Sequence, residues 1–156
     1  MVIAECFFWL ARWVKSMTPF VQSLTKRRCL TVFATTSLQE VVNVLANNSI
    51  GALVVVSKNG AIEGIVSERD IVRRLSWSGS IHNLTASDVM TKDVLSVTTN
   101  VTSSDLMQVM TENKCRHLPI VSGSRLVGMV SIGDVVKRLL EKYNAEVEQM
   151  RSFINS

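Results

Sequence analysis

Cysteine is scarce in this chain of 156 residues, and its few cysteines lie far apart. Cys6, Cys29 and Cys115 are an odd number and show no C-x-x-C spacing, which excludes a zinc knuckle and argues against a disulfide framework. Reduced thiols are typical of proteins inside the cell. We therefore expect a cytoplasmic protein.

Long apolar runs are also missing. Glu5, Arg12 and Lys15 interrupt the longest apolar stretch, whereas a membrane span needs about 18 uncharged residues. The chain is 47% hydrophobic and 19% charged, while disordered chains are rich in charge and poor in apolar residues. These values predict a globular protein without a membrane span.

Histidine is nearly absent, with only His82 and His117 present. The sequence also lacks a Gly-x-Gly-x-x-Gly turn, a Walker loop and a His-Glu-x-x-His motif. Cys115 and His117 would share one face of a strand, but no third group is placed to orient a nucleophile. No His, Cys and carboxylate cluster has the spacing of metal ligands. We expect neither an enzyme, nor a metal site, nor a required cofactor.

Net charge is missing from most of the chain. The formal charge of +4 comes from the first 28 residues, where Glu5 is the only acid. The basic residues of this segment are Arg12, Lys15, Lys26, Arg27 and Arg28. The rest of the chain carries equal numbers of acidic and basic residues, so it offers no basic surface for a phosphate backbone. Nucleic-acid binding is therefore not expected.

Residues 1–17 combine aromatic residues such as Phe7, Trp9 and Trp13 with two bases, a pattern typical of an amphipathic helix. Three interpretations remain open for this segment. It is a helix that packs on the core, a leader that directs the chain to the mitochondrial matrix, or a helix that lies on a membrane surface. Any membrane contact would be made through this segment.

An internal repeat occupies most of the remaining chain. Residues 30–57 match residues 95–122 at a constant offset of 65, as in Leu30-Thr31-Val32 and Leu95-Ser96-Val97. After a turn that is one residue shorter in the second copy, residues 64–75 match residues 128–139 at an offset of 64. Such a repeat predicts two copies of one structural unit.

Each copy has the pattern of a short extended stretch, a helix, two strands and a second helix. The predicted strands are Leu30–Val32, Ala52–Val56 and Ala61–Val66 in the first copy, and Leu95–Val97, Leu118–Val121 and Leu126–Val130 in the second. The predicted helices contain Leu38, Val41 and Leu45 in the first copy and Leu106, Val109 and Met110 in the second, with a further helix starting near Ser67 or Ser131.

The fold class predicted is α+β, with two β-α-β-β-α repeats. A unit of about 60 residues buries little apolar surface, so we expect the copies to pack sheet against sheet with pseudo-two-fold symmetry. Similar lead-ins, Phe20–Leu24 and Ala86–Met90, precede the two copies. The segments expected are a leader or N-terminal helix 1–17, repeat one 18–75, a linker 76–83, repeat two 84–143 and a helical extension 144–156.

At the end of each repeat stands the motif Gly-hydrophobic-x-Ser-x-x-Asp, at Gly64–Asp70 and at Gly128–Asp134. Together with Ile50–Val56 and Arg116–Val121, this motif makes residues 18–143 resemble a tandem pair of CBS domains, or Bateman module. The resemblance is greatest to the short stand-alone pairs of bacteria and mitochondria. It implies an adenine nucleotide bound between the repeats and a flat homodimer with helices in contact, to which the C-terminal helix would contribute.

Two interpretations of the Ser-x-x-Asp turns remain open. A strand that ends in serine and turns into a helix presents free backbone N–H groups to a phosphate, and Asp70 or Asp134 would accept hydrogen bonds from a ribose. In the family this aspartate contacts the ribose. The same residues also fit a capping box, in which Ser67 or Ser131 caps the helix and the aspartate reaches back.

The two copies differ where a ligand would bind. Arg69 has Gly133 as its counterpart, and Gly51-Ala52 corresponds to Arg116-His117, so the sites should not be equivalent. Arginine or histidine would supply charge for a phosphate, although Arg116 and His117 also fit a solvated strand edge. The candidate ligand-binding residues are Ile50, Gly51, Ala52, Ser67, Arg69, Asp70, Arg116, His117, Leu118, Pro119, Ser131 and Asp134.

The resemblance implies a regulatory module that senses nucleotide occupancy and modulates a partner protein, whose identity the sequence does not reveal. The ligands expected are AMP, ADP or ATP, with NAD(P)H and S-adenosylmethionine as further members of the same ligand class. Two alternatives remain. The chain is a scaffold that binds no nucleotide, or it is a detached regulatory subunit of a larger enzyme, such as the dehydrogenase that acts on inosine monophosphate.

Overall fold

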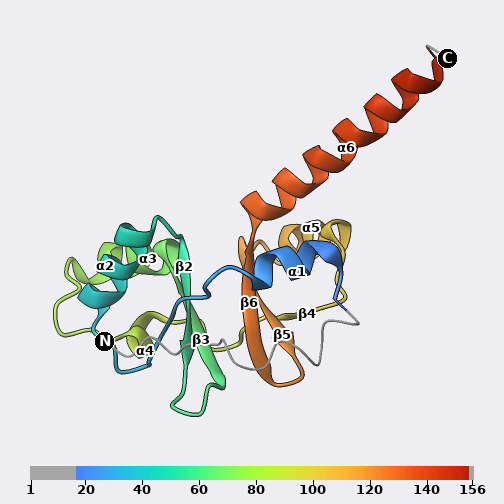
Figure 1. Ribbon diagram of the computed structural model, residues 1–156. Coiled ribbons are helices and arrows are strands. Elements are labelled where there is room, and N and C mark those ends of the chain that lie inside the picture. The colour runs from blue at the N-terminus through green and yellow to red at the C-terminus, as the bar shows by residue number, and fades with distance from the viewer. Residues whose placement is uncertain (1–16, 155–156) are drawn as a thin grey trace.

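The computed structural model describes residues 17–154 and shows two three-stranded sheets that face each other, with helices on their outer sides (Figure 1). The leader predicted for residues 1–17 lies, except for Met17, outside the described residues. The first half contains α1 (Pro19–Thr25), β1 (Thr31–Val32), α2 (Leu38–Asn48), β2 (Ala52–Val56), β3 (Ile62–Ser67) and α3 (Glu68–Ser78). The second half contains α4 (Ala86–Val89), β4 (Val97–Thr98), α5 (Ser103–Glu112), β5 (His117–Ser122), β6 (Arg125–Ser131) and α6 (Ile132–Ile154).

The first sheet has the order β1-β2-β3, with β1 parallel and β3 antiparallel to β2. Every residue of β2 is buried, as expected for a short continuous apolar run in the centre of a sheet. In β3 the buried residues Gly64 and Val66 alternate with more exposed ones. Gly60, with φ of +81°, lies in the turn between the two strands, where its positive φ favours glycine.

The second sheet repeats this arrangement as β4-β5-β6, and Leu118 pairs with Val130 as Leu53 pairs with Val66. Between the sheets, Val54 and Val56 of β2 form one buried cluster with Leu126 of β6. The predictions of an α+β fold, two tandem repeats and packing of sheet against sheet are therefore confirmed.

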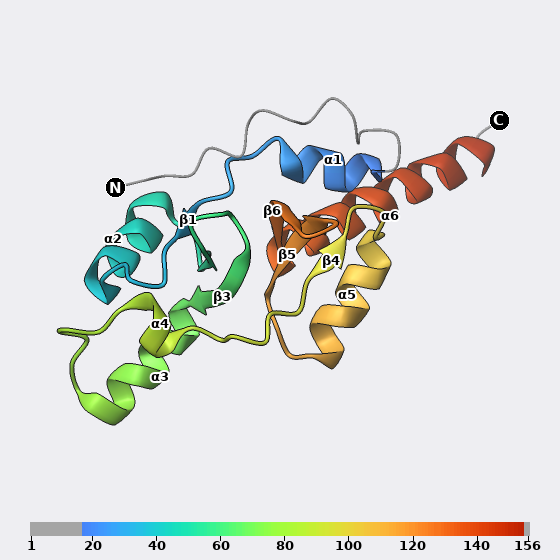
Figure 2. The ribbon, with the colours of Figure 1, turned by 90° about the horizontal axis from the view of Figure 1, so that it is seen from below.

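The short helix α1 precedes the first sheet in the chain but packs on the second one. Val21 and Leu24 are buried among Leu118, Ile120 and Val130 of the second repeat. Thr18, the N-cap of α1, donates its N–H to the Thr99 carbonyl over 3.2 Å. Figure 2 shows α1 lying over β6 and the start of α6.

Helix α4 makes the reciprocal crossing. Its buried Ala86 belongs to the core of the first sheet, and Thr91 exchanges two backbone hydrogen bonds with Ile65 of β3 (3.0 and 2.9 Å). Each core is thus completed by the lead-in of the other repeat. The segments expected from the repeat, 18–75 and 84–143, thus exchange their lead-in helices.

The helices that end the repeats run farther than expected. Helix α3 continues to Ser78 and ends at Gly79, whose φ is +66°, so the predicted linker 76–83 begins inside a helix. Helix α6 passes without a break through the boundary expected between 143 and 144. Within residues 17–154, no helix is both long and apolar enough to cross a membrane.

Candidate functional site

Two clefts lie between the repeats, and each is built from both of them. Cleft A, of about 430 Å³, lies between the Ser67–Asp70 turn and the segment Asn113–Leu118 that leads into β5. Cleft B, of about 340 Å³, lies between Ser131 and Asp134 on one side and residues 27–30 and 49–52 on the other. The two clefts have corresponding walls because the repeats are related by pseudo-symmetry.

The candidate residues divide between these clefts. Cleft A receives Ser67, Arg69, Asp70, Arg116, His117 and Leu118, and cleft B receives Ile50, Gly51, Ala52, His117, Ser131 and Asp134. His117 therefore lines both clefts. Pro119 is buried in β5, pairs with Met129 and lines neither cleft. Because each cleft is lined by residues of both repeats, a ligand in either cleft would contact both repeats at once.

The Ser67–Asp70 turn of cleft A is a complete capping box. The Ser67 N–H and hydroxyl both donate to Asp70 Oδ2, over 2.8 and 2.6 Å, and the Asp70 N–H donates to Ser67 Oγ over 3.4 Å. Asp70 Oδ1 accepts no hydrogen bond from the part of the chain that the structure describes. The capping interpretation is therefore correct for the geometry, and it leaves one carboxylate oxygen for a ligand.

In cleft B, both oxygens of the equivalent carboxylate, that of Asp134, accept hydrogen bonds. Asp134 Oδ2 accepts from the N–H and hydroxyl of Ser131 (2.9 and 2.7 Å), and Asp134 Oδ1 accepts from Arg27 Nη1 over 2.6 Å. Arg27 was not among the candidates, since its basic run indicated only where the net charge lies. The two clefts thus differ not only in the residues that differ between the copies but also in this ion pair between Arg27 and Asp134.

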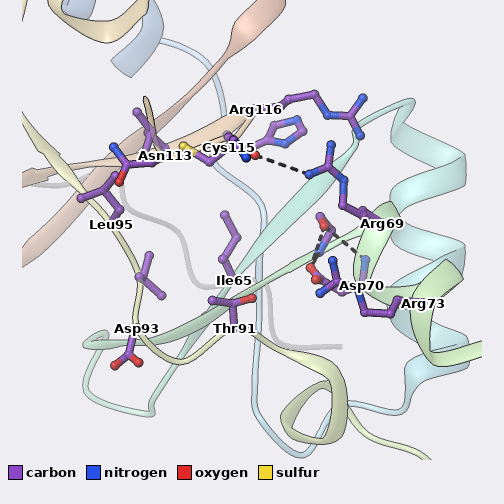
Figure 3. A pocket seen from close by; sticks show the side chains of 15 residues that line it. Ile65, Arg69, Asp70, Arg73, Thr91, Asp93, Leu95, Asn113, Cys115 and Arg116 are labelled. Carbon is purple, nitrogen blue, oxygen red and sulfur yellow. Dashed lines mark hydrogen bonds between the residues drawn. The ribbon is translucent and has the colours of Figure 1, made fainter. Parts of the chain in front are cut away.

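Positive charge surrounds cleft A. Its lining includes Arg69, Arg73, Lys114 and Arg116 against the carboxylates Asp70 and Asp93. Figure 3 shows Arg69 reaching from the start of α3 across the cleft, where its Nη1 donates to the Lys114 carbonyl over 3.4 Å. Arg73, one helical turn after Arg69, could have been predicted from helical spacing, whereas Asp93 and Lys114 had no sequence signal of their own. The excess of cations suits an anionic ligand.

Burial shifts the pKa values of Cys115 and His117, the two groups that a nucleophilic pair would need. Burial and the charge of Arg116 lower the pKa of His117, and the nearby carboxylates of Glu68 and Asp134 oppose this only in part. Burial also raises the pKa of the Cys115 thiol. An activated cysteine needs the opposite shift, toward thiolate, so cleft A does not favour thiol chemistry.

Gly51 provides the space that brings His117 between the clefts. A Cβ at this position would lie 3.0 Å from Cε1 of the His117 ring and 3.5 Å from a Glu68 carboxylate oxygen. A side chain at this position would displace the His117 ring by a few tenths of an ångström, whereas glycine lets the ring lie against the start of β2. In the part of the chain that the structure describes, no group of three His, Cys, Asp or Glu residues could hold a metal ion.

Acid is expected to remove the stabilisation that Asp134 provides. Burial raises the pKa of Asp134, but the hydrogen bonds from Ser131 and the Arg27 ion pair outweigh burial and hold this pKa below its usual value. A pKa below the unfolded value of about 3.9 means that the charged carboxylate stabilises the fold above that pH, and that the contribution is lost as pH falls through the folded-state pKa. Asp134→Asn should lower the free energy of unfolding by roughly 1 kcal/mol at pH 7 and by less at pH 3.

Urea titrations of both proteins at pH 7 and pH 3 measure this difference. An equal loss at the two pH values would show that the charge of Asp134 does not support the helix start.

Comparison with known proteins places this geometry in a family. The family model of the CBS domain matches residues 21–76 and residues 86–141. The mitochondrial CBS domain-containing protein CBSX3 of Arabidopsis thaliana is 32% identical over 123 residues, which cover 76% of this chain and 60% of the plant protein's length. The crystal structure of the CBS-domain protein ATU1752 from Agrobacterium tumefaciens is 37% identical and superposes with a TM-score of 0.72, covering 76% of this chain and 98% of that one.

Two more distant structures share the fold and contain ligands. CBSX2 in complex with AMP has a TM-score of 0.66 and 24% identity, and covers 72% of this chain and 89% of its own. The CBS domain pair of MJ0100, in complex with 5′-methylthioadenosine and S-adenosyl-L-methionine, has a TM-score of 0.67 and 22% identity, and covers 81% of this chain and 98% of its own. Two matched domains, the crossed lead-ins and the paired clefts lead to one conclusion: this chain belongs to the CBS-domain family and carries two CBS domains in tandem.

Proposed function

We propose that this CBS pair is a regulatory module that binds an adenine nucleotide in cleft A and transmits its occupancy to a partner protein. CBS pairs are in general regulatory nucleotide-binding modules, and the two ligand-bound neighbours contain adenosine compounds. AMP, ADP and ATP are the favoured ligands, with NAD(P)H and S-adenosylmethionine as members of the same class. The role proposed is that of a sensor and not of a catalyst.

The observation that carries the proposal is the combination of a free carboxylate oxygen and several cations in cleft A. Asp70 Oδ1 can accept hydrogen bonds from the two hydroxyls of a ribose, as an acidic residue does in dinucleotide-binding folds. Arg69 and Arg116 can bind a phosphate with charge-assisted hydrogen bonds, and Ile65 and Leu118 offer apolar walls for a base. A volume of about 430 Å³ falls in the range of small-molecule pockets.

Cleft B is proposed as the weaker of the two sites. A ribose that approached Asp134 would compete with Arg27 for Oδ1, whereas Asp70 offers the same oxygen without a competitor among the described residues. Binding in cleft B would also involve Ile50, Gly51, Ala52 and Ser131. The two clefts should therefore fill in sequence as the nucleotide concentration rises, cleft A first.

A homodimer is part of the proposal. Val72 and Leu75 of α3 and Val136 and Leu140 of α6 are exposed apolar residues on the helices that end the repeats. Burial of such a surface between two copies would remove it from water.

We propose the cytoplasm as the compartment, and the mitochondrial matrix as the alternative that the name of the plant relative supports.

Nucleotides should raise the melting temperature of the purified protein as their concentration increases, because they bind the folded state only. The measurement is a thermal denaturation series with AMP, ADP, ATP, NADH and S-adenosylmethionine up to millimolar concentration, with adenosine as the unphosphorylated reference. Arg69→Ala and Arg116→Ala should each reduce the preference for AMP over adenosine by about tenfold, since a charge-assisted phosphate contact is lost. Arg125→Ala, which changes an exposed arginine outside both clefts, should leave this preference unchanged.

A melting temperature that stays constant across all these ligands would contradict the sensor proposal. The scaffold interpretation would then be preferred.

A further inference from the structure

The C-terminal half of α6 has no buried residue, so packing on the described chain contributes little to its stability. The start of α6 packs on α5 and β6, but every residue from Glu141 to Ile154, a segment named the arm below, is exposed. Figures 1 and 2 show the arm projecting away from the two sheets. Isolated helices of this length are only marginally stable in water, and helices in proteins gain most of their stability from packing of an apolar face.

Six of the seven exposed large apolar residues of α6 form one seam, and the seventh, Phe153, lies beside it. The six alternate between spacings of four and three residues, which is the heptad pattern of a coiled coil. The seam residues are Val136, Leu140, Tyr143, Val147, Met150 and Ile154, with exposed fractions of 42%, 58%, 64%, 44%, 66% and 83%. A second helix with the same pattern would cover this seam.

We propose that the arm forms a two-stranded parallel coiled coil with the arm of a second copy of this chain. In the heptad, Leu140, Val147 and Ile154 occupy the a positions. Val147 and Ile154 are β-branched, as two-stranded parallel coiled coils favour at a positions, while the d positions hold Val136, Tyr143 and Met150. The occupant is thus a second copy, whose seam is identical and therefore self-complementary.

Charge complementarity supports the parallel orientation. Glu146 occupies a g position and Arg151 the following e position. In a parallel pair, each g residue faces the e residue five positions later on the other helix, so two Glu146–Arg151 ion pairs form across the seam. Within one helix these residues lie on different faces, because only residues three or four apart are neighbours.

The ion pairs inside each arm do not prevent this arrangement. Arg151 Nη1 lies 3.0 Å from Glu148 Oε1, and Lys142 Nζ lies 4.0 Å from Glu146 Oε1. Both pairs are exposed, and exposed pairs contribute little to stability. They can therefore rearrange or extend when a second helix arrives. The inference rests on the proposed homodimer but is independent of nucleotide binding.

A charge exchange tests the inference with the full-length chain. Glu146→Arg and Arg151→Glu should each raise the dimer dissociation constant by about tenfold, because each creates two like-charge contacts across the seam. The double variant, which exchanges the two charges, should return this constant to nearly the wild-type value. Sedimentation equilibrium at several protein concentrations measures it, and Glu148→Gln, which removes only a pair inside one helix, is the control.

A cysteine in the seam tests the orientation. Met150→Cys, combined with Cys6→Ser, Cys29→Ser and Cys115→Ser, should form a disulfide between copies on mild oxidation, because equal d positions face each other only in a parallel pair. Position 149 points away from the seam, so Gln149→Cys in the same background should form far less of the disulfide between copies. Equal cross-linking at both positions, or no recovery in the double charge variant, would overturn the coiled coil.

The failure of the coiled coil and the failure of the proposed homodimer are distinguishable. The wild-type chain could be a dimer whose dissociation constant is the same in the charge variants and in a chain that ends at Leu140. This result would support the homodimer and contradict the coiled coil formed by the arm. A wild-type chain that is monomeric, and that associates only when residues 1–16 are deleted, would show that the chain's own N-terminal segment covers the seam. That outcome would overturn the coiled coil as well.

Discussion

Asp70→Ala is expected to weaken the binding of AMP to cleft A by about 10- to 100-fold and to lower the stability of the empty protein as well. Hydrogen bonds from a ribose to a carboxylate are charge-assisted, and each contributes about 1.5–3 kcal/mol. The same substitution removes the acceptor of the Ser67 N–H and hydroxyl, which costs about 0.5–2 kcal/mol of stability. The measurements are calorimetric titration with AMP and urea denaturation without ligand.

Two controls separate these effects. Asp105 forms the same capping box with Thr102 at the start of α5, with 2.6 Å between the Thr102 hydroxyl and Asp105 Oδ2, and it lines neither cleft. Asp105→Ala should therefore lower the melting temperature and leave AMP affinity unchanged. Ser67→Ala removes a hydroxyl of the cap but retains the Asp70 carboxylate, so it should weaken AMP binding less than Asp70→Ala does. If Asp70→Ala changed only stability, as Asp105→Ala does, Asp70 would be a capping residue and not a ribose ligand.

Leu24→Ala is expected to destabilise the protein by about 2–5 kcal/mol, the cost of truncating a fully buried leucine. Leu24 is 1% exposed and packs in the core of the second repeat, although it precedes the first repeat in the chain. Urea denaturation measures the loss, and hydrogen exchange should show reduced protection in β5 and β6. Leu95→Ala, at a leucine that is 43% exposed, is the matched control and should cost far less.

Deletions extend this prediction. A chain without residues 1–16 retains α1 and its Thr18 cap, so it should melt cooperatively near the wild-type temperature. A chain without residues 1–25 would expose Leu118, Ile120 and Val130, and it should lose the cooperative transition. A shorter chain that remained as stable as the wild type would show that α1 is not part of the core.

The repeated elements of this fold could be predicted because their signals are local. The continuous run Ala52–Val56 is the central strand of its sheet, and Leu38, Val41 and Leu45 recur at the spacing that buries one face of α2. The clefts could be predicted for a related reason, since a strand that turns directly into a helix leaves backbone groups and a capping carboxylate at one place. The Ser-x-x-Asp pattern alone was not specific, however, because Thr102 and Asp105 form the same box away from both clefts.

The sequence by itself determined the fold class, the two repeats, the order of strands and helices, and the polar turns that line the clefts. Each of these depends on residues close together in the chain, where periodicity and backbone preference decide the outcome. Only the tertiary structure decided that α1 completes the second core, that Arg27 binds Asp134 from 107 positions away and that His117 lies between the clefts. These contacts arise because each sheet buries its apolar face against whichever segment the path of the chain brings to it, and no local pattern in the sequence records that path.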